Sequence, residues 1–532
     1  MQDGLEWSPG DLYSAAQARA IDARAIGQGG IAGYILMQRA AAAALQALRA
    51  RWSAARDLLV FCGAGNNGGD GYVLARDALR QGFRVQVVAA VDPAALTGDA
   101  ATAAKDCVAA GVPVLPLSGI DLSAICAAAD VIVDALLGTG LKSAVREPLA
   151  AVIGAINDSA RPVLALDVPS GLCADTGRVQ GLAVRAALTV TFIVDKTGLW
   201  LAQGPEYAGE CRLATLDLAA MTLAETPVIQ RLSATRLRRR WQRRAREAHK
   251  GHAGHVMVLG GAEGMPGAAR LAAEAALAGG AGRVTVLCAP ASVTAIAAGR
   301  AEVMVSGVAR AADAEALLAR ADVVALGPGL GLTDWSRELF SLAISLKTPM
   351  VIDADALSLL AELGGDSAGD ALGPRPAWVL TPHPGEAARL LQTETRAIQA
   401  DRLAALRALC ARYPGVTVLK GAGTLIGEEA PVDRSVKTVS PPACAICTEG
   451  NPAMATAGMG DVLTGVVAAL LAQGGTPWEA ACTGVWLHAQ AGDEAARARG
   501  IDRGLLASQL LDGLPSIWGR LLGIDRASGW RA

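Results

Sequence analysis

The chain has 532 residues with a net charge of −2, is rich in Gly (61 residues) and is only 4% aromatic. Its length predicts two to four domains of about 150 residues each, and its balanced charge argues against a dedicated nucleic-acid binder. Although 52% of the residues are hydrophobic, we find no apolar run of about 18 residues that would span a membrane. The longest candidate, 462–478, is broken by the polar, Gly- and Pro-containing segment 473–477.

The N-terminus has no basic stretch followed by an apolar core, so we expect no secretory signal. Ten cysteines are too sparse for a disulfide framework. Cys444 and Cys447 form a CxxC pair, but no second pair completes a zinc site, which favours ordinary reduced cysteines. We therefore expect a cytoplasmic protein.

Both halves of the chain alternate short β-branched runs with Ala-rich helical stretches, the pattern of parallel sheets covered by helices. We predict an α/β protein with domains at 1–225 and 226–532. An Arg-rich connector at 231–248 follows the boundary; a solvated connector is favoured over a phosphate-binding segment. The expected strands are 57–62, 84–89, 129–133, 162–166, 256–259, 284–288, 322–326, 350–352, 378–380 and 416–419.

The clearest motif of the first half is the Gly-rich segment 63–71, which lies between the strand 57–62 and an expected helix at 72–80. Glycines let the backbone approach a ligand, and a helix N-terminus favours phosphate. The dinucleotide-binding spacing holds only loosely, but the segment also contains Asn66, Asn67 and Asp70, which a purely structural turn does not need. Ligand binding is therefore favoured over a turn alone.

Two further strand ends supply carboxylates, Asp134 and Asp167. If the three strands are parallel neighbours, Asn67, Asp134 and Ser170 would converge as oxygen ligands, which suit a hard cation or an alkali ion better than zinc. Asp167 would remain free as a general acid or base. Each Asp taken alone also fits a cap or a turn.

The strings GAGNNGGDG, DALLGTGL, LDVPSGL and TFIVDKTG resemble the YjeF N-terminal family of NAD(P)H-hydrate epimerases. The resemblance implies a Rossmann-like three-layer domain that interconverts the R and S forms of hydrated NADH and NADPH. It also implies that Asp167 touches the reacting end and that Asn67, Asp134 and Ser170 bind K⁺. Asp195 stands where the resemblance leads us to expect proline. The implied substrate contacts are Asn66, Asn67, Gly68, Gly69, Asp70, Gly138, Thr139, Gly140, Leu141, Lys142, Ser143 and Ala144.

In the second half, four motifs each follow a strand or precede a helix: GPGLG at 327–331, TPHPGE at 381–386, KGAGT at 420–424 and AGMGD at 457–461. The last leads into an expected helix at 462–471. Its Gly-rich turn would direct N–H groups at a transferring phosphoryl group, and Asp461 beside it is placed to accept a hydroxyl proton. The chain contains no Walker motif.

This half resembles the ribokinase-like superfamily, and within it the ADP- or ATP-dependent NAD(P)H-hydrate dehydratases, through HKGHAGHVMVLGG, VIDADAL, TEGNPAMATAGMGDVLTG and the motifs above. The order of epimerase and then dehydratase is that of the bifunctional NAD(P)H-hydrate repair enzymes. The resemblance implies contacts to the hydrated substrate from Ala268, Gly329, His383 and Asp461. It implies nucleotide contacts from Lys420, Gly421, Ala422, Gly423, Thr424 and Gly460.

We therefore expect a two-site repair enzyme. The first domain would equilibrate the epimers; the second would phosphorylate the C6 hydroxyl of the S form with ADP (ATP is an alternative) and Mg²⁺, and eliminate phosphate. Its partners would be NADHX, NADPHX and an adenine nucleotide, without nucleic acid or membrane, in a homo-oligomer. The alternatives are a small-molecule kinase fused to a nucleotide-binding domain, and a non-catalytic dinucleotide sensor.

Overall fold

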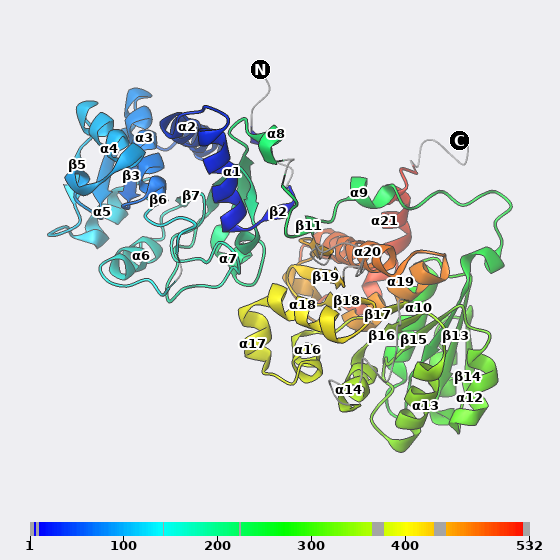
Figure 1. The fold of residues 1–532 in the computed structure, drawn as a ribbon. Helices are drawn as coiled ribbons and strands as arrows, with labels where there is room; N and C mark the ends of the chain where they lie inside the picture. Colours follow the sequence, from blue (N-terminus) through cyan, green and yellow to red (C-terminus); the bar gives the residue numbers. More distant parts are fainter. Residues whose placement is uncertain are drawn as a thin grey trace. The chain divides into compact units, whose positions relative to one another are not determined.

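In the computed structural model, the chain forms two compact units, residues 1–231 and 232–532 (Figure 1). The structure describes residues 5–6, 10–141, 143–222, 225–363, 377–429 and 443–524. Each unit contains an α/β sheet of its own, which confirms the predicted fold class. None of the helices in these ranges is long and apolar enough to cross a membrane.

The sheet of unit 1 has the strand order β1-β10-β8-β7-β6-β3-β4-β5. Its strands pair in parallel from β10 to β5, and β1 is antiparallel to β10. The strands are β1 (Leu5–Glu6), β3 (Asp57–Cys62), β4 (Arg84–Ala89), β5 (Val114–Pro116), β6 (Val131–Ala135), β7 (Val163–Leu166), β8 (Leu188–Phe192) and β10 (Glu210–Ala214); β2 (Leu12–Tyr13) and β9 (Asp195–Lys196) form a separate pair.

Helices cover both faces of this sheet because its central strands are apolar on both sides. Alternate residues of β3, such as Leu58 and Val60, pack against α1 (Ala15–Gly27), α2 (Gly33–Arg51), α3 (Asn66–Arg80) and α4 (Gly98–Ala109). The intervening residues, Leu59 and Phe61, pack against α5 (Leu122–Ala128) and α6 (Leu149–Asp158). Unit 1 is therefore the three-layer domain that the sequence predicts.

The sheet of unit 2 contains the strand order β20-β19-β18-β17-β16-β15-β12-β13-β14. The run from β18 to β14 is parallel, whereas β18, β19 and β20 form an antiparallel meander that the sequence analysis does not predict. The strands are β12 (His255–Leu259), β13 (Arg283–Cys288), β14 (Val303–Gly307), β15 (Val323–Leu326), β16 (Met350–Ile352), β17 (Trp378–Leu380), β18 (Val416–Leu419), β19 (Thr424–Glu428) and β20 (Cys444–Cys447).

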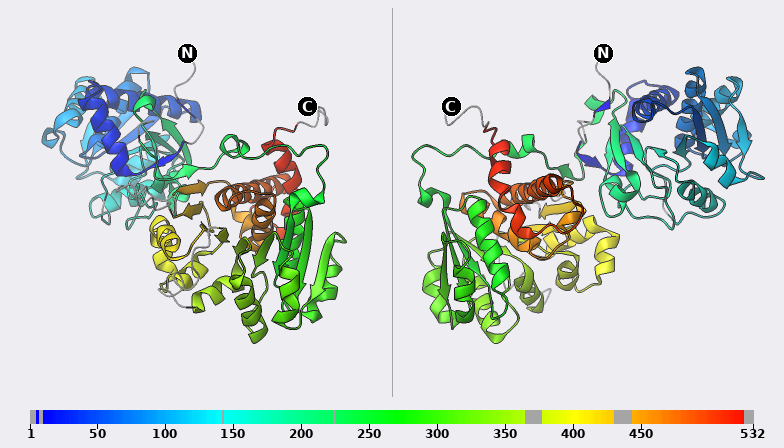
Figure 2. Two further views of the ribbon diagram at one scale, coloured as in Figure 1. Left: turned by 45° about the vertical axis from the view of Figure 1, so that its right-hand side comes forward. Right: turned by 180° about the vertical axis from the view of Figure 1, so that it is seen from behind.

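One face of this sheet packs against three helices, α10 (Pro266–Ala278), α19 (Met459–Ala472) and α20 (Pro477–Arg499). The other face is covered by helices that include α13 (Asp334–Ser345), α14 (Ala354–Glu362) and α18 (Arg402–Arg412) (Figure 2). The shorter helices along the chain are α7 (Gly204–Ala208), α8 (Ala219–Thr222), α9 (Ala234–Arg238), α11 (Val293–Ala297), α12 (Ala311–Leu318), α16 (Pro384–Leu390), α17 (Thr395–Ala400) and α21 (Leu514–Leu521).

Two glycine-rich segments are helical where the sequence predicts turns. Helix α3 begins at Asn66 rather than at residue 72, and α19 begins at Met459 rather than at residue 462. Close packing explains the glycines of α3: a Cβ at Gly68 would lie 2.1 Å from the Gly63 carbonyl oxygen, and one at Gly71 would lie 2.6 Å from Ala135 Cβ. Glycine weakens a helix by about 1 kcal/mol per residue, so the approach of neighbouring elements outweighs helix propensity here.

The Arg-rich connector is anchored on unit 2 through an aromatic side chain. Trp241 donates a hydrogen bond from its indole N–H to Thr483 Oγ1 at 2.9 Å and packs edge-on against Trp518, with ring centroids 5.4 Å apart. Arg244 donates to Gln473 Oε1 at 2.7 Å, at the end of α19. Trp241 therefore anchors the connector on the domain, while the arginines between 236 and 246 are exposed, as expected of the predicted solvated segment.

Helices α10 and α19 cross at Gly465, where a Cβ would lie 2.0 Å from the Ala272 carbonyl oxygen. We expect Gly465→Ala to lower the free energy of unfolding of unit 2 by about 1–3 kcal/mol, as overpacking does in other cores. The measurement is a urea titration followed by circular dichroism. The control is Gly519→Ala in α21, where a Cβ would meet nothing within 4 Å. Equal stability of the two variants would contradict this account of the crossing.

Candidate active sites

Unit 1 contains a cavity of about 680 Å³ at the carboxyl ends of its parallel strands. Most of the sequence-predicted substrate contacts line it. Gly68, Gly69 and Ala144 are not among the lining residues; Gly69 packs against Met37, with a Cβ position 2.7 Å from its sulfur. Lys142 lies outside the described residues. The predicted contacts in the lining are Asn66, Asn67, Asp70, Gly138, Thr139, Gly140, Leu141, Ser143 and Asp167.

Asp167 lies at the end of β7 and has a left-handed backbone, with φ of 63°. This conformation is costly for a non-glycine residue and is concentrated at functional sites. Its Oδ1 accepts hydrogen bonds from Lys196 Nζ at 2.5 Å and from the Phe192 N–H at 3.1 Å. The Lys196 side chain is only 2% exposed. Lys196 is not among the site residues predicted from the sequence, although a lysine within an otherwise apolar segment is a usable signal.

Three further carboxyl groups line the same cavity, those of Asp22, Asp70 and Asp99. Burial raises the pKa of Asp70 well above its usual value; Asp167 and Asp22 raise it further, and Lys196 lowers it. Burial also raises the pKa of Asp22, an effect that Lys196 opposes. The cavity thus places a carboxyl group that tends to be protonated near a carboxylate paired with an ammonium group, an arrangement suited to proton transfer.

The predicted cation ligands Asn67, Asp134 and Ser170 gather around the main chain of Leu137. Asn67 Nδ2 donates to the Leu137 carbonyl at 2.9 Å, and the Leu137 N–H donates to Ser170 Oγ at 2.8 Å. Ser170 Oγ donates to Asp134 Oδ1 at 2.6 Å. Among the described residues, the buried Asn67 Oδ1 has no hydrogen-bond partner, and such an orphaned acceptor needs a donor or a cation. Burial raises the pKa of Asp134 to about 6, although its hydrogen bonds with Ser170 oppose the shift.

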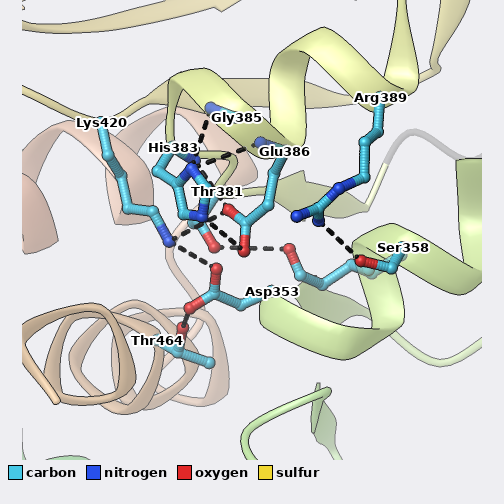
Figure 3. Close-up of polar contacts among 10 residues, drawn as sticks. Asp353, Ser358, Thr381, His383, Gly385, Glu386, Arg389, Lys420 and Thr464 are labelled. Atoms are coloured by element: carbon cyan, nitrogen blue, oxygen red, sulfur yellow. Dashed lines mark hydrogen bonds and ion pairs between the residues drawn. The ribbon is translucent and has the colours of Figure 1, made fainter. Parts of the chain in front are cut away.

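In unit 2 a buried ion pair joins the ends of two strands (Figure 3). Asp353 follows β16 and Lys420 follows β18; Lys420 Nζ lies 2.6 Å from Asp353 Oδ1. Thr464, on α19, donates to Asp353 Oδ2 at 2.7 Å. A Cβ at Gly460 would lie 3.2 Å from Lys420 Nζ. The Gly-rich start of α19 therefore lies directly on this ion pair. Neither Asp353 nor Thr464 is identified as functional by the sequence analysis.

The ion pair shapes the ionisation of its neighbours. Burial opposes the charge of Asp353, but Lys420 and Thr464 outweigh it, so the pKa of Asp353 is lowered. Burial raises the pKa of Asp461 to about 7; the charge of Asp353 adds to this and Lys420 opposes it. Burial likewise raises the pKa of Glu386 to about 7. A pKa near 7 suits a general base at neutral pH.

His383 is held in one tautomer by the start of α16 (Figure 3). Its Nδ1 accepts hydrogen bonds from the N–H groups of Gly385 at 2.9 Å and Glu386 at 3.3 Å. Burial, and then the charge of Lys420, lowers the pKa of His383. A neutral ring whose Nδ1 accepts must carry its proton on Nε2, so His383 presents a hydrogen-bond donor. Its side chain is 51% exposed and thus accessible to a ligand.

Ala268, in the first turn of α10, lies beside Gly329, which follows β15. Gly329 has φ of 61°, and a Cβ there would lie 3.3 Å from Ala268 Cβ and 2.6 Å from the Met265 carbonyl oxygen. In the same Gly-rich turn, the N–H of Gly331 donates to Asp355 Oδ2 at 2.8 Å. Asp355 also raises the pKa of Asp461, which links this turn to the start of α19.

Comparisons with known proteins agree with this two-site arrangement. A family model described as YjeF-related protein N-terminus matches residues 33–198, and one described as NAD(P)H-hydrate dehydratase matches residues 256–516. The bifunctional NAD(P)H-hydrate repair enzyme Nnr of Coxiella burnetii is 45% identical over 506 residues, which cover 94% of this chain and 97% of that protein. The chain belongs to the family of bifunctional NAD(P)H-hydrate repair enzymes.

The family relationship extends to a second bacterium: the repair enzyme Nnr of Escherichia coli is 39% identical over 488 residues, covering 92% of this chain and 90% of that protein. Among solved structures, unit 2 resembles the ADP/ATP-dependent NAD(P)H-hydrate dehydratase from Bacillus subtilis, co-crystallised with ATP and Mg²⁺. The identity is 27% with a TM-score of 0.45, covering 54% of this chain and 97% of that chain.

Proposed function

We propose that this member of the repair family carries out both reactions, epimerisation and dehydration, in one chain. Unit 1 interconverts R- and S-NAD(P)HX, and unit 2 uses ADP, or ATP in its place, to convert the S form to NAD(P)H. The strongest support is that the two family models match unit 1 and then unit 2, and that the similarity to the bifunctional repair enzymes spans nearly the whole length of both chains. Each unit also contains its own lysine–aspartate pair at the carboxyl ends of parallel strands.

In unit 1, the nicotinamide hydrate enters the cavity with its reacting carbon near Asp167. Asp167, held by Lys196, and Asp70, whose pKa is raised, form the acid–base pair. One protonates the departing C6 oxygen, so that water leaves with the C6–O bonding electrons and the lone pair of the ring nitrogen stabilises the cation at C6. The other takes a proton from the water molecule that adds back to either face of the ring. The lining residues Asn66, Asn67 and Asp70, together with those at 138–141 and 143, hold the dinucleotide.

In unit 2, the C6 hydroxyl of the S form attacks the terminal phosphoryl group and displaces AMP (ADP when ATP is the donor), while Asp461 takes the hydroxyl proton. The N–H groups at the start of α19, from Gly458 to Gly460, stabilise the developing charge. Phosphate then leaves with the C6–O bonding electrons, and loss of a proton from the adjacent carbon restores the double bond. Ala268, Gly329 and His383 position the hydrate.

The nucleotide is held by the loop 420–424 and by Gly460. Mg²⁺ supplies a counter-charge to the phosphates when the nucleotide binds. Such an ion is usually held by phosphates together with one or two carboxylates. Asp353 and Glu386, which both face Lys420, would provide these carboxylates.

For unit 1 we propose K⁺ as the ion bound by Asn67, Asp134 and Ser170. The orphaned Asn67 Oδ1 supports this assignment, because an oxygen acceptor without a donor fits a weakly charged cation. We expect epimerisation, measured as the rate of R-to-S conversion, to fall when tetramethylammonium replaces K⁺, while dehydration of purified S-NADHX stays constant. Equal epimerisation rates in the two salts would remove K⁺ from unit 1.

The variant Asp461→Asn tests the dehydratase half. Without the base, we expect dehydration to fall by about 10²–10⁴-fold, with epimerisation unchanged. In the wild type, dehydration should decline as the pH drops below about 7, because Asp461 must be ionised to accept the proton. The assay incubates mixed NADHX epimers with ADP and follows recovery of reduced-nicotinamide absorbance. Asp512→Asn, at a side chain that is 86% exposed, is the control.

Normal turnover by Asp461→Asn would refute its role as base. Accumulation of a stable phosphorylated product by the wild type would instead indicate a small-molecule kinase.

The variant Asp167→Asn tests the epimerase half. It removes a carboxylate at the reacting carbon, so we expect R-to-S conversion to fall by about 10²–10⁴-fold while the S form is still dehydrated. Recovery of NADH from mixed epimers should then stop once the S form is consumed. Asp217→Asn in the same unit, at a side chain that is 85% exposed, should show complete recovery. Complete recovery with Asp167→Asn would exclude Asp167 from catalysis.

A further inference from the structure

Arg402, at the first position of α18, is a buried cation that the proposed mechanism does not use. The residue is only 3% exposed, and burial lowers the pKa of its guanidinium to about 10. Among the described residues its hydrogen-bond acceptors are Gln399 and main-chain carbonyls, with no ion pair to a carboxylate. A buried charge without an acidic partner is expensive, so its retention calls for a reason.

The guanidinium lies inside the hairpin loop that joins β18 to β19. Its N–H groups donate to the carbonyls of Leu419 at 3.2 Å, Lys420 at 3.3 Å and Gly423 at 3.3 Å. A Cβ at Gly421, where φ is 138°, would lie 2.8 Å from one guanidinium nitrogen. The glycine that follows Lys420 therefore leaves space for Arg402.

The same arrangement leaves N–H groups of the loop available. Thr424 Oγ1 donates to the Gly421 carbonyl at 2.9 Å. Together with the three carbonyls bound by Arg402, four carbonyls of this loop accept hydrogen bonds from side chains. Within the described residues, the N–H groups of Gly421, Ala422 and Gly423 donate to no main-chain acceptor. Adjacent free N–H groups of this kind form a concave anion-binding site.

We propose that Arg402 is a positioning residue for the nucleotide: it gathers the carbonyls of the 420–424 loop so that the N–H groups of Gly421, Ala422 and Gly423 face a phosphate group of ADP. Its positive charge also favours an anion on this loop. The inference rests on the proposed placement of the nucleotide at this loop. Arg402 would act on the nucleotide only through the loop, without touching the nucleotide itself.

The test compares Arg402→Lys with Arg407→Lys in the purified full-length protein. Lysine keeps the charge but cannot bind three carbonyls in a planar fork. Arg407 is exposed on the same helix and serves as the matched control. We expect Arg402→Lys to raise the KM for ADP by about 10–100-fold, the loss that a misplaced binding group causes. The kcat, the KM for S-NADHX and the epimerisation rate should stay near those of the control.

A KM for ADP equal to that of the control, or an equal rise in both KM values, would overturn the proposal. If Arg402→Lys does not fold, amide hydrogen exchange of the wild type decides: ADP should slow exchange in the peptide containing Gly421–Gly423, and unchanged exchange would also overturn it. Calorimetric titration with ADP measures nucleotide affinity without turnover. A wild type that binds ADP but does not restore NADH would refute the proposed function. The ADP affinity of Arg402→Lys, compared by calorimetry with that of Arg407→Lys, would still decide the role of Arg402.

Discussion

Both sites depend on a buried lysine–aspartate pair that joins the carboxyl ends of two strands. Lys196 pairs with Asp167 in unit 1, and Lys420 pairs with Asp353 in unit 2. Removing one partner of a buried pair costs about 3–5 kcal/mol, because the other charge is left uncompensated. Each pair acts on the pKa values of its site. Burial raises those of Asp22 and Asp70, Asp167 adds to the shift and Lys196 opposes it; for Asp461, Asp353 raises the pKa and Lys420 lowers it.

The sequence predicts the strands that carry these groups because buried parallel strands are apolar throughout. β3, β4, β16, β17 and β18 have the predicted bounds. The sequence predicts the starts of α3 and α19 too late, at residues 72 and 462, whereas the helices begin at Asn66 and Met459. Glycine has a low helix propensity, so these first turns are predicted as loops although close packing stabilises them as helix. The meander of β19 and β20, and with it the hairpin that surrounds Arg402, depends on strand pairing that hydrophobic patterning does not specify. Lys196, Asp353 and Thr464 likewise acquire roles only through neighbours distant in sequence.

Asp195 shows how the structure accommodates a residue where the family resemblance leads us to expect proline. Its carboxylate is buried; it accepts a hydrogen bond from the Gly10 N–H at 3.0 Å and lies 3.8 Å from Arg231. Arg231 in turn stacks on Trp200, 3.7 Å from the ring centroid. Burial raises the pKa of Asp195, and Arg231 opposes the shift. The departure from proline therefore coincides with a set of compensating contacts beside Lys196, while Lys196 keeps its bond to Asp167.

Helix α19 is both one of the most apolar segments of the chain and the element whose N-terminus lies at the candidate site of unit 2. This helix is apolar on every side because α10, α20 and the sheet surround it, and a helix of that kind must be buried. Burial places its N-terminus at the end of β16, beside Asp353 and Lys420, where a low dielectric strengthens the attraction of N–H groups for an anion. A more polar α19 would need solvent along one side, and its N-terminus, which we propose as the phosphoryl site, would no longer be held against Asp353 and Lys420.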